Sequence, residues 1–345
     1  MIDDLRRVVV PLLEGQTIDA AAMEQAVAAI MDARCEPAEI ASFLTALRCR
    51  GESVPQLVGA ARAMRARSLK IPCRRRGLLD TCGTGGDSLH TFNISTVTAF
   101  VAAAAGATVA KHGNRSASSK SGSADVLEAL GVSLDLTPEQ TAQCIDEIGL
   151  GFCFAPRLHA AMKSAAPIRQ QLGFRTIFNL LGPLTNPANA EYQVIGAGRT
   201  HLAQLLAEAL AELGTVRALI VCGNDELDEV SLWGETAVFV VESGQVRRET
   251  WSPETLGLPV CEVAALRVSS PAESAAVIRQ VLAGEEGPSR DIVLANTAAA
   301  LVACQLAANA PDGVARARAA IDSGSATNLL EQFAQRTQEL AGRTG

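Results

Sequence analysis

The sequence predicts an α/β protein with a small N-terminal all-helical domain and a large α/β domain built on a mostly parallel central sheet. Two observations support this prediction. Residues 1 to about 70 show helix signals and no strand pattern, and after residue 77 short apolar runs alternate with helical segments. Because a domain contains roughly 100–200 residues, the 345 residues are expected to form about two domains.

The helical domain is expected to span 1–72. Pro37 stands in the first turn of one of its helices, and Ser53 with Gln56 forms a capping box at another. A later stretch, 163–188, interrupts the alternation and is itself typical of helix. Because it has no strand partner, we expect it to return to the helical domain, which leaves 77–162 and 189–345 for the α/β domain.

The α/β domain shows its strands as short apolar runs and its helices by their caps. Strands are expected at 77–82, 107–110, 152–154, 192–195 and 216–222, followed by a hairpin of 236–241 and 245–250. Helices are expected at 95–105, 123–130, 137–148 and 201–213, then from Ser270 to Gly284. The remainder of the chain is predicted to be mostly helical.

Composition excludes several classes of protein. Hydrophobic residues make up 48% and charged residues 19%, which excludes a disordered chain. The net charge of −7 argues against binding nucleic acid or an anionic membrane. The nine cysteines contain no CxxC pair and are typical of reduced thiols. No signal peptide or membrane span is expected, so the protein is predicted to be cytoplasmic.

The first motif is the run Gly83-Thr84-Gly85-Gly86-Asp87, directly after a predicted strand. Glycines let a backbone turn tightly and present its N–H groups to an anion. The run 93–96, Asn-Ile-Ser-Thr, then opens a helix, which is a second anion-receptive position. An ordinary turn and a helix cap explain the glycines alone equally well.

The second motif, 111–120, follows the next predicted strand and holds three fixed cations, several hydroxyls and an amide. Ligands bind at the carboxyl ends of the strands of an open parallel sheet. A glycine-rich and a cationic loop at adjacent strand ends therefore favour a ligand with more than one phosphate. A solvated loop is the alternative.

Acidic residues at 225–229 follow a third strand, and carboxylates with substrate phosphate oxygens are ligands that Mg2+ prefers. The alternative is a solvated turn. Arg169 offers a planar fork for a carboxylate, although an exposed helix arginine looks the same in sequence. The basic stretch 62–76 is interpreted as a solvated helix face and linker, with steering of an anionic substrate as the alternative.

Five motifs in this order resemble those of the anthranilate phosphoribosyltransferase family: GTGGD, NIST, KHGNRSxSSxxGSADVLEALG, RTIFNLLGPLTNP and LDE. The resemblance covers most of the chain, and the combination is far more specific than any single loop. It implies a nucleoside-phosphorylase-like phosphoribosyltransferase fold and a homodimer. The implied reaction, the second step of tryptophan biosynthesis, uses Mg2+ to transfer the phosphoribosyl group of 5-phosphoribosyl diphosphate (PRPP) to the amine of anthranilate, releasing pyrophosphate.

The resemblance also implies roles for individual residues. Those that would hold PRPP are Gly83, Gly86, Asp87, Thr91, Asn93, Ile94, Ser95, Thr96, Lys111, His112, Gly113, Asn114, Arg115, Ser116, Ala117, Ser118, Ser119 and Ser123. Those that would contact anthranilate are Gly83, Asn114, His159 and Arg169, and those that would bind Mg2+ are Ser95, Asp228 and Glu229. No general base is expected, because the aromatic amine is already neutral and needs positioning more than deprotonation.

The sequence departs from the family pattern in a few places. Ser88-Leu89-His90 replaces a smaller segment that commonly follows GTGGD, and Ala117 stands where valine is common. Neither change removes a charge or a donor. The alternatives are a pyrimidine nucleoside phosphorylase, which would not need paired acidic metal ligands, and a non-catalytic relative that binds nucleic acid, which the net charge disfavours.

Overall fold

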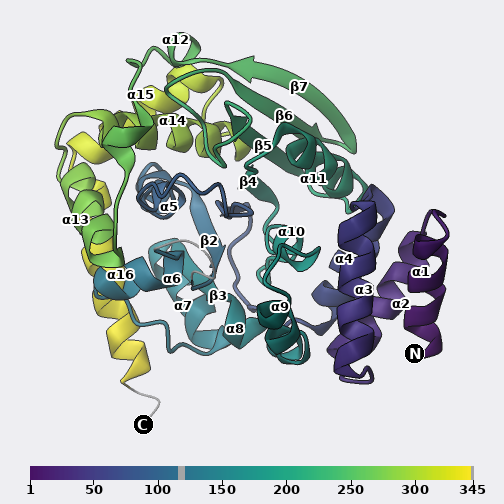
Figure 1. The fold of residues 1–345 in the computed structure, drawn as a ribbon. Helices are drawn as coiled ribbons and strands as arrows, with labels where there is room; N and C mark the ends of the chain where they lie inside the picture. The colour runs from purple at the N-terminus through teal and green to yellow at the C-terminus, as the bar shows by residue number, and fades with distance from the viewer. Residues whose placement is uncertain (116–120, 343–345) are drawn as a thin grey trace.

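The computed structural model describes residues 1–115 and 121–342. Its centre is a seven-stranded sheet in the order β3-β2-β1-β4-β5-β6-β7 (Figure 1). The strands are β1 (Leu78–Asp80), β2 (Thr108–Gly113), β3 (Leu150–Phe154), β4 (Tyr192–Gly196), β5 (Arg217–Gly223), β6 (Thr236–Glu242) and β7 (Gln245–Trp251). The pairs from β3 to β5 are parallel and the last two are antiparallel, which confirms the predicted mostly parallel sheet.

The hairpin between β6 and β7 turns at Ser243 and Gly244, as predicted. Their φ angles are 51° and 73°. Two successive positive φ angles give the kind of two-residue turn whose twist matches that of the paired strands. The hairpin at this edge of the sheet is therefore specified by its own turn residues, which the sequence shows directly.

The central strands are buried on both faces, and their alternate side chains enter two different cores. In β5, Leu219 and Val221 pack into one core, whereas Ile220 and Cys222 pack into the other. This division follows from the two-residue period of a strand. The first core lies under α5 and the C-terminal helices, and the second is continuous with the N-terminal helices.

The N-terminal helices are α1 (Asp3–Leu13), α2 (Ala20–Met31), α3 (Pro37–Arg50) and α4 (Val54–Arg67). The last two begin where the signals at Pro37 and Ser53 place them. Ser53 and Gln56 form the predicted capping box of α4, and the Asp19 carboxylate accepts a hydrogen bond from the N–H of Ala22 at the start of α2. The N-terminal all-helical part of the predicted fold is therefore confirmed.

The segment 163–188 contains a 3-10 turn (Ala160–Ser164, beginning just before it) and the short helices α9 (Ala166–Leu172) and α10 (Phe178–Leu181). Its side chains Ile168 and Phe178 belong to the same core as the N-terminal helices, and Figure 1 shows α9 and α10 on the side of the sheet nearer to α4. The hydroxyl of Ser164 donates to the carbonyl of Ile30 in α2 at 2.8 Å. We call 163–188 the insert; the exact division into domains remains a prediction.

The remaining helices surround the sheet, and the last third of the chain is mostly helical, as predicted. They are α5 (Ile94–Ala104), α6 (Ser123–Ala129), α7 (Pro138–Ile148), α8 (Ala155–Leu158), α11 (Thr200–Glu212), α12 (Pro253–Leu256), α13 (Pro271–Leu282), α14 (Pro288–Ala303), α15 (Ala310–Asp322) and α16 (Ser325–Ala341). A second 3-10 turn covers Val263–Leu266. No helix in the described part of the chain has the length and apolarity that crossing a membrane requires.

Several strand boundaries differ from the sequence prediction, and the difference at β2 affects the site. The strand predicted at 107–110 continues to Gly113, so Lys111 and His112 lie inside β2 and not in the loop after it. Both are in register with β3, opposite Phe152 and Cys153. A polar pair inside a buried strand is tolerated here because neighbouring chain segments supply hydrogen-bond partners, which local sequence does not reveal.

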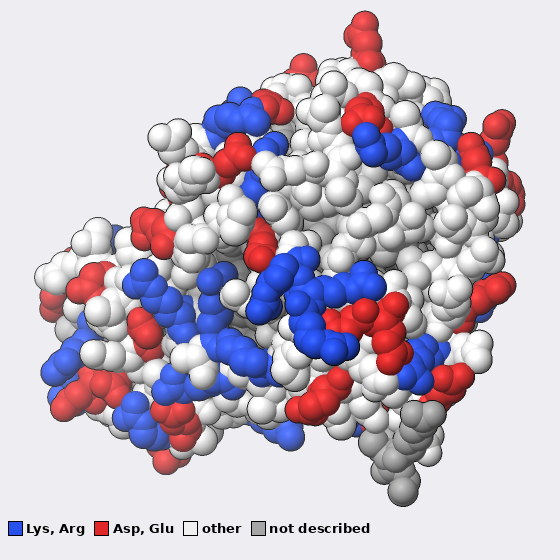
Figure 2. All heavy atoms as spheres, turned by 180° about the vertical axis from the view of Figure 1, so that it is seen from behind, with Lys and Arg blue, Asp and Glu red and all other residues white. Residues whose placement is uncertain are grey.

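The basic stretch 62–76 connects α4 with β1 and is fixed by acids and carbonyls. Arg67 forms an ion pair with Asp32, Arg74 forms one with Asp146, and Arg65 donates to the carbonyl of Leu184 at 2.7 Å. Figure 2 shows Lys and Arg side chains gathered across the back face with Asp and Glu among them. The stretch therefore includes a structural linker, with several of its cations already paired.

We predict that Gly59→Ala lowers the free energy of unfolding by about 1–3 kcal/mol, since overpacking costs this much. A Cβ at Gly59 in α4 would collide with the backbone of Ala20 in α2. The control is Gly182→Ala, where φ is −48° and the Cβ would meet nothing within 4 Å. Chemical denaturation measures both, and an equal loss in the two variants would contradict the close packing of α2 on α4.

Candidate active site

The glycine loop, residues 83–87, leaves the carboxyl end of β1. Gly85 and Gly86 adopt φ angles of 64° and 78°, which side-chain-bearing residues rarely adopt. The N–H of Thr84 donates to the carbonyl of Gly196 at 2.8 Å, which ties the loop to the end of β4. The Asp87 carboxylate accepts the N–H of Leu89 at 3.0 Å. The loop is thus a built turn at the strand ends.

The start of α5 stands beside this loop, but its residues have different roles. The amide of Asn93 joins Ser121 and Ser274, with its Oδ1 accepting their hydroxyls at 2.7 and 2.9 Å. The N–H of Ile94 is already bonded to the carbonyl of Phe92, and Thr96 is fully buried in the core. Ser95 is the residue of this run whose hydroxyl faces the site.

Lys111 brings a buried ammonium group to the same place. Its Nζ donates to the carbonyl of Thr81 at 2.8 Å, to the Thr81 hydroxyl at 3.2 Å and to the Ser95 hydroxyl at 3.3 Å. Burial lowers the pKa of Lys111, and the carboxylates of Asp80, Asp228 and Glu229 are among the groups that oppose this change. The ammonium group is therefore held by Thr81 and Ser95, and nearby carboxylates favour its charge.

Asp228 and Glu229 follow β5 and face the glycine loop. Packing around the Asp228 carboxylate, together with the neighbouring Asp87 carboxylate, raises the pKa of Asp228 to about 7. Burial and Asp228 raise the pKa of Glu229 well above its ordinary value. The Asp87 carboxylate opposes the ionisation of Asp228 and Glu229, and a site crowded in this way favours a cation.

Ser95, Asp228 and Glu229 line one small pocket at the strand ends together with Gly83 of the glycine loop. Its lining residues are Thr81, Gly83, Ser95, Thr98, Val194, Gly196, Asp228, Glu229 and Asn296. A Cβ at Gly83 would lie 3.2 Å from the Asp228 carboxylate, and one at Gly196 would overlap the Asp228 backbone. The two glycines therefore let the acidic loop approach the end of β1.

The donor set of this pocket fits a hard divalent cation. Two adjacent carboxylates and the Ser95 hydroxyl offer oxygen ligands, which Mg2+ prefers, and the described residues that line the pocket include no thiol or imidazole. A second group, Asp80, Cys82 and His112, also brings possible ligand atoms within 4.8 Å of one another. Its thiol and imidazole suit softer metals than Mg2+.

Asp80 is a buried acid beneath the site that the sequence analysis did not identify. Its carboxylate accepts the His112 N–H at 2.9 Å and the Asn186 amide at 2.7 Å. Burial raises the pKa of Asp80 to about 6, although Asn186 and Lys111 oppose the shift. Asn186 lies in the quoted motif RTIFNLLGPLTNP. The sequence therefore showed the motif, but it did not show that Asn186 bonds to Asp80.

The side chains of His112 and His159 lie against each other below the insert. Their ring centroids are 5.1 Å apart, and the Nδ1 of His112 is 3.0 Å from the carbonyl of Gly182. Burial lowers the pKa of His112 to about 4 and that of His159 to about 3. Both imidazoles are therefore neutral at neutral pH and offer polar atoms without charge.

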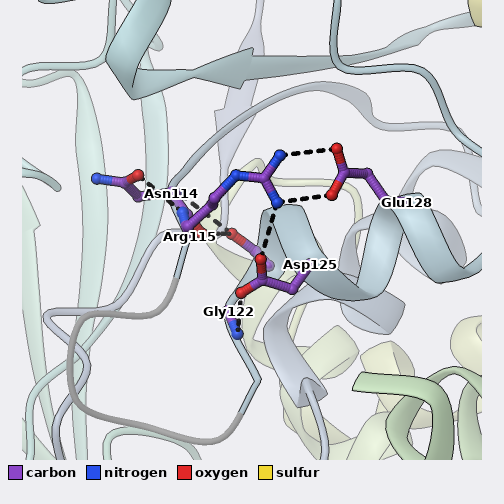
Figure 3. Close-up of polar contacts among 6 residues, drawn as sticks. Asn114, Arg115, Gly122, Asp125 and Glu128 are labelled. Atoms are coloured by element: carbon purple, nitrogen blue, oxygen red, sulfur yellow. Dashed lines mark hydrogen bonds and ion pairs between the residues drawn. The ribbon is translucent and has the colours of Figure 1, made fainter. Parts of the chain in front are cut away.

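Figure 3 shows the junction between β2 and α6, where Arg115 is held by acids of α6. Its guanidinium donates to Glu128 at 2.6 and 2.8 Å and to Asp125 at 3.0 Å, which raises the pKa of Arg115. The Asp125 carboxylate also accepts the N–H of Gly122 at 3.0 Å. Arg115 thus connects the end of β2 with α6.

The other predicted PRPP residues make different contacts. In Figure 3, the Asn114 side-chain nitrogen points away from Asp125 and Glu128. The Ser123 hydroxyl donates to the Asn114 carbonyl at 3.2 Å. Gly113 has no room for a Cβ beside Ser123 and Phe152. Thr91 pairs with Arg267 in an isolated bridge. The predicted PRPP residues Ser116, Ala117, Ser118 and Ser119 lie outside the described residues.

Arg169 projects from α9 of the insert. Its guanidinium carbon lies 5.5 Å from the centre of the Phe178 ring, and burial lowers its pKa. Within 1–115 and 121–342 it has no ion pair, so its planar fork is available for a carboxylate. Sequence reasoning missed Arg175 on the same insert, which donates to the carbonyls of Gly85 and Gly86.

Comparisons with known proteins agree with this architecture. The family model of the glycosyl transferase family a/b domain matches residues 75–327, and that of the helical bundle domain matches residues 7–68. Anthranilate phosphoribosyltransferase from Symbiobacterium thermophilum is 48% identical over 327 residues, covering 95% of this chain and 96% of the relative. The Herpetosiphon aurantiacus protein of that name is 51% identical over 316 residues, covering 91% of this chain and 92% of the relative.

Solved structures give the same result. The anthranilate phosphoribosyltransferase of Thermus thermophilus superposes with a TM-score of 0.90 at 41% identity, covering 98% of this chain and 100% of that chain. The Saccharomyces cerevisiae enzyme, solved in complex with PRPP and Mg, superposes with a TM-score of 0.90 at 29% identity, covering 97% and 98%. Fold and site thus define a glycosyl transferase with a helical bundle and an a/b domain. Within that class, the chain belongs to the anthranilate phosphoribosyltransferase family.

We predict that His159 makes the protein lose stability in acid. Its pKa is about 3 in the folded state and near 6.5 when exposed, so below pH 6.5 the unfolded chain binds a proton that the folded chain refuses. From pH 8 to pH 5 this group alone removes about 2 kcal/mol of stability. His159→Leu should reduce that loss in denaturation experiments, and the exposed His201→Gln should keep it. Equal acid sensitivity in both variants would contradict the burial of a neutral His159.

Proposed function

We propose that this chain transfers the phosphoribosyl group of PRPP to the amine of anthranilate, releasing pyrophosphate in the second step of tryptophan biosynthesis. The observation that supports this most strongly is the single pocket shared by the glycine loop, Ser95 and the acids after β5. It lies in a chain of which 95% or more matches anthranilate phosphoribosyltransferases. A pyrimidine nucleoside phosphorylase would have no use for the paired acids, and no observation favours that reading.

The glycine loop, the start of α5 and the junction from Lys111 to Ser123 form the proposed PRPP cradle. Its backbone N–H groups suit phosphate oxygens, and Lys111 supplies a buried positive charge. Several predicted members act indirectly. Asn93 links Ser121 to Ser274, and Arg115 is bonded to α6. Their side chains therefore hold the cradle together, besides any contact that they make with the substrate.

Mg2+ is the proposed cofactor, held by Asp228, Glu229 and Ser95. The fit rests on the crowding of the carboxylates and on the carboxylate and hydroxyl oxygens that line the pocket. When bound, the ion neutralises charge on the diphosphate. Lys111, whose Nζ donates to the Ser95 hydroxyl, adds a fixed positive charge from the protein itself.

Arg169 is proposed to bind the carboxylate of anthranilate, with Gly83, Asn114 and His159 completing the site. The reaction breaks the bond between C1 of the ribose and the diphosphate oxygen and forms a bond from C1 to the amine nitrogen, which then releases one of its protons to water. The amine uses its own lone pair, so the protein has to position it against C1. Lys111 and loop N–H groups stabilise the charge that develops on the leaving pyrophosphate.

We further propose that the protein is a cytoplasmic homodimer. Support comes from α1, whose inner face is buried at Leu5, Val8 and Leu12 while Val10 and Leu13 are 42% and 73% exposed. Apolar side chains on the outer side of a small domain suit a second copy of the chain. Analytical ultracentrifugation of the wild type and of Leu13→Glu tests this assignment.

The proposed reaction is tested by following anthranilate fluorescence in the presence of purified protein, PRPP and Mg2+. Loss of fluorescence that needs both PRPP and Mg2+ would establish the reaction. No loss with folded protein would reject it. Phosphorolysis of uridine or thymidine by the same sample would then support the phosphorylase alternative.

We predict that Arg169→Ala raises the KM for anthranilate by about 10- to 100-fold, because a hydrogen-bonded charge contributes about 1.5–3 kcal/mol. The KM for PRPP should change little. Lys163→Gln, an exposed change in the same insert, is the control. Unaltered anthranilate kinetics in Arg169→Ala would show that this arginine does not hold the substrate.

We predict that Asp228→Asn combined with Glu229→Gln raises the Mg2+ concentration for half-maximal rate by at least about tenfold. The control is Asp225→Asn combined with Glu226→Gln, which removes the same charge from the same loop. There Asp225 caps Thr200 and Glu226 accepts from Trp233. Equal Mg2+ dependence in the two double variants would refute the ligand assignment.

A further inference from the structure

Arg175 connects the insert directly to the glycine loop. Its Nη1 donates to the carbonyl of Gly85 at 2.6 Å and to that of Gly86 at 3.3 Å, and its Nη2 reaches the carbonyl of Thr84 at 3.5 Å. Three successive carbonyls of the loop thus face one guanidinium. Arg175 follows α9 and precedes α10, so it belongs to the segment that also carries Arg169.

The opposite side of the same loop faces the acids. The N–H of Gly85 donates to the Asp228 carboxylate, and the Arg175 charge also acts on that carboxylate. The Gly85 residue is therefore held between a cation of the insert and an acid of the loop after β5. The loop carbonyls accept hydrogen bonds from Arg175, and this fixes the orientation of the loop. In that orientation, other N–H groups of the loop can bind an anion.

The loop leaves room for this contact. At Gly86, where φ is +78°, a Cβ would collide with the Arg175 guanidinium. Arginine also suits the contact better than lysine, since its planar fork carries several donors in fixed directions and lysine is a point charge. The residue types on both sides of the contact therefore match its geometry.

We propose that Arg175 is a positioning residue that couples the anthranilate side of the site to the PRPP side. It holds the glycine loop in its binding orientation from the same short segment that presents Arg169. Occupation of one site then favours the ordered form of the other, and such coupling is reciprocal. This inference rests on the proposed function and adds a residue that acts on PRPP through the loop.

The experiment compares Arg175→Gln and Arg175→Lys with wild type and with Arg279→Gln. Arg279 is a matched control because it also donates to a main-chain carbonyl of another element, that of Ala129 at 3.0 Å. The first readout is amide hydrogen exchange of 83–87 without ligands. We expect about tenfold faster exchange in Arg175→Gln, a smaller change in Arg175→Lys and none in Arg279→Gln.

The second readout is steady-state kinetics with calorimetric PRPP binding. Arg175→Gln should raise the KM for PRPP about tenfold, with kcat changed much less, and Arg175→Lys should restore part of the loss. The effect of saturating Mg2+ and a non-reactive anthranilate analogue on PRPP affinity should shrink toward none in Arg175→Gln. A merely structural arginine would lower the amount of active protein and leave KM and coupling unchanged.

Three results would overturn the inference. Unchanged exchange in Arg175→Gln would mean that the arginine does not hold the loop. Faster exchange with an unchanged KM for PRPP, or with full coupling retained, would mean that holding the loop does not serve binding. If the wild type transfers no phosphoribosyl group, the proposed function fails and Arg175 positions no substrate here, whereas the exchange result still reports on the contact itself.

Discussion

The site depends on one electrostatic constraint: like charges are gathered at the carboxyl ends of the parallel strands. Asp228 and Glu229 oppose each other's ionisation beside Asp87, and the buried ammonium of Lys111 balances only part of that charge. Glycines at 83 and 196 allow this crowding, because any side chain there would push the acidic loop away. The arrangement therefore favours a cation together with an anionic ligand, which is what a magnesium diphosphate provides.

A second feature is that the chain reaches this pocket from two directions. The sheet supplies the glycine loop, Lys111 and the acids, and the insert packs on the N-terminal helices while sending Arg175 to the loop. Asn186, just before the chain returns to β4, adds a hydrogen bond to the buried Asp80. Substrates held by the sheet and by the insert would thus meet at the seam between the two.

The fold was predictable because its signals are local. The capping box at Ser53 and the two-residue turn at Ser243 are fixed by neighbouring residues, and the structure contains both. For the site, the sequence predicted only that the motifs lie at the ends of neighbouring strands. The continuation of β2 through Lys111 depends on Asp80 and Thr81, and the Arg175 contact joins residues 90 positions apart. Such partners are chosen by tertiary packing, which no local pattern encodes.

The most direct test of this account is to locate a divalent cation in crystals grown with PRPP and Mn2+, a close substitute for Mg2+ with a strong anomalous signal. The account predicts an anomalous peak within about 2.0–2.3 Å of oxygen atoms of Asp228 or Glu229, with the diphosphate completing its coordination. A cation held by PRPP alone, far from both carboxylates, would contradict the view that the crowded acids exist to bind it.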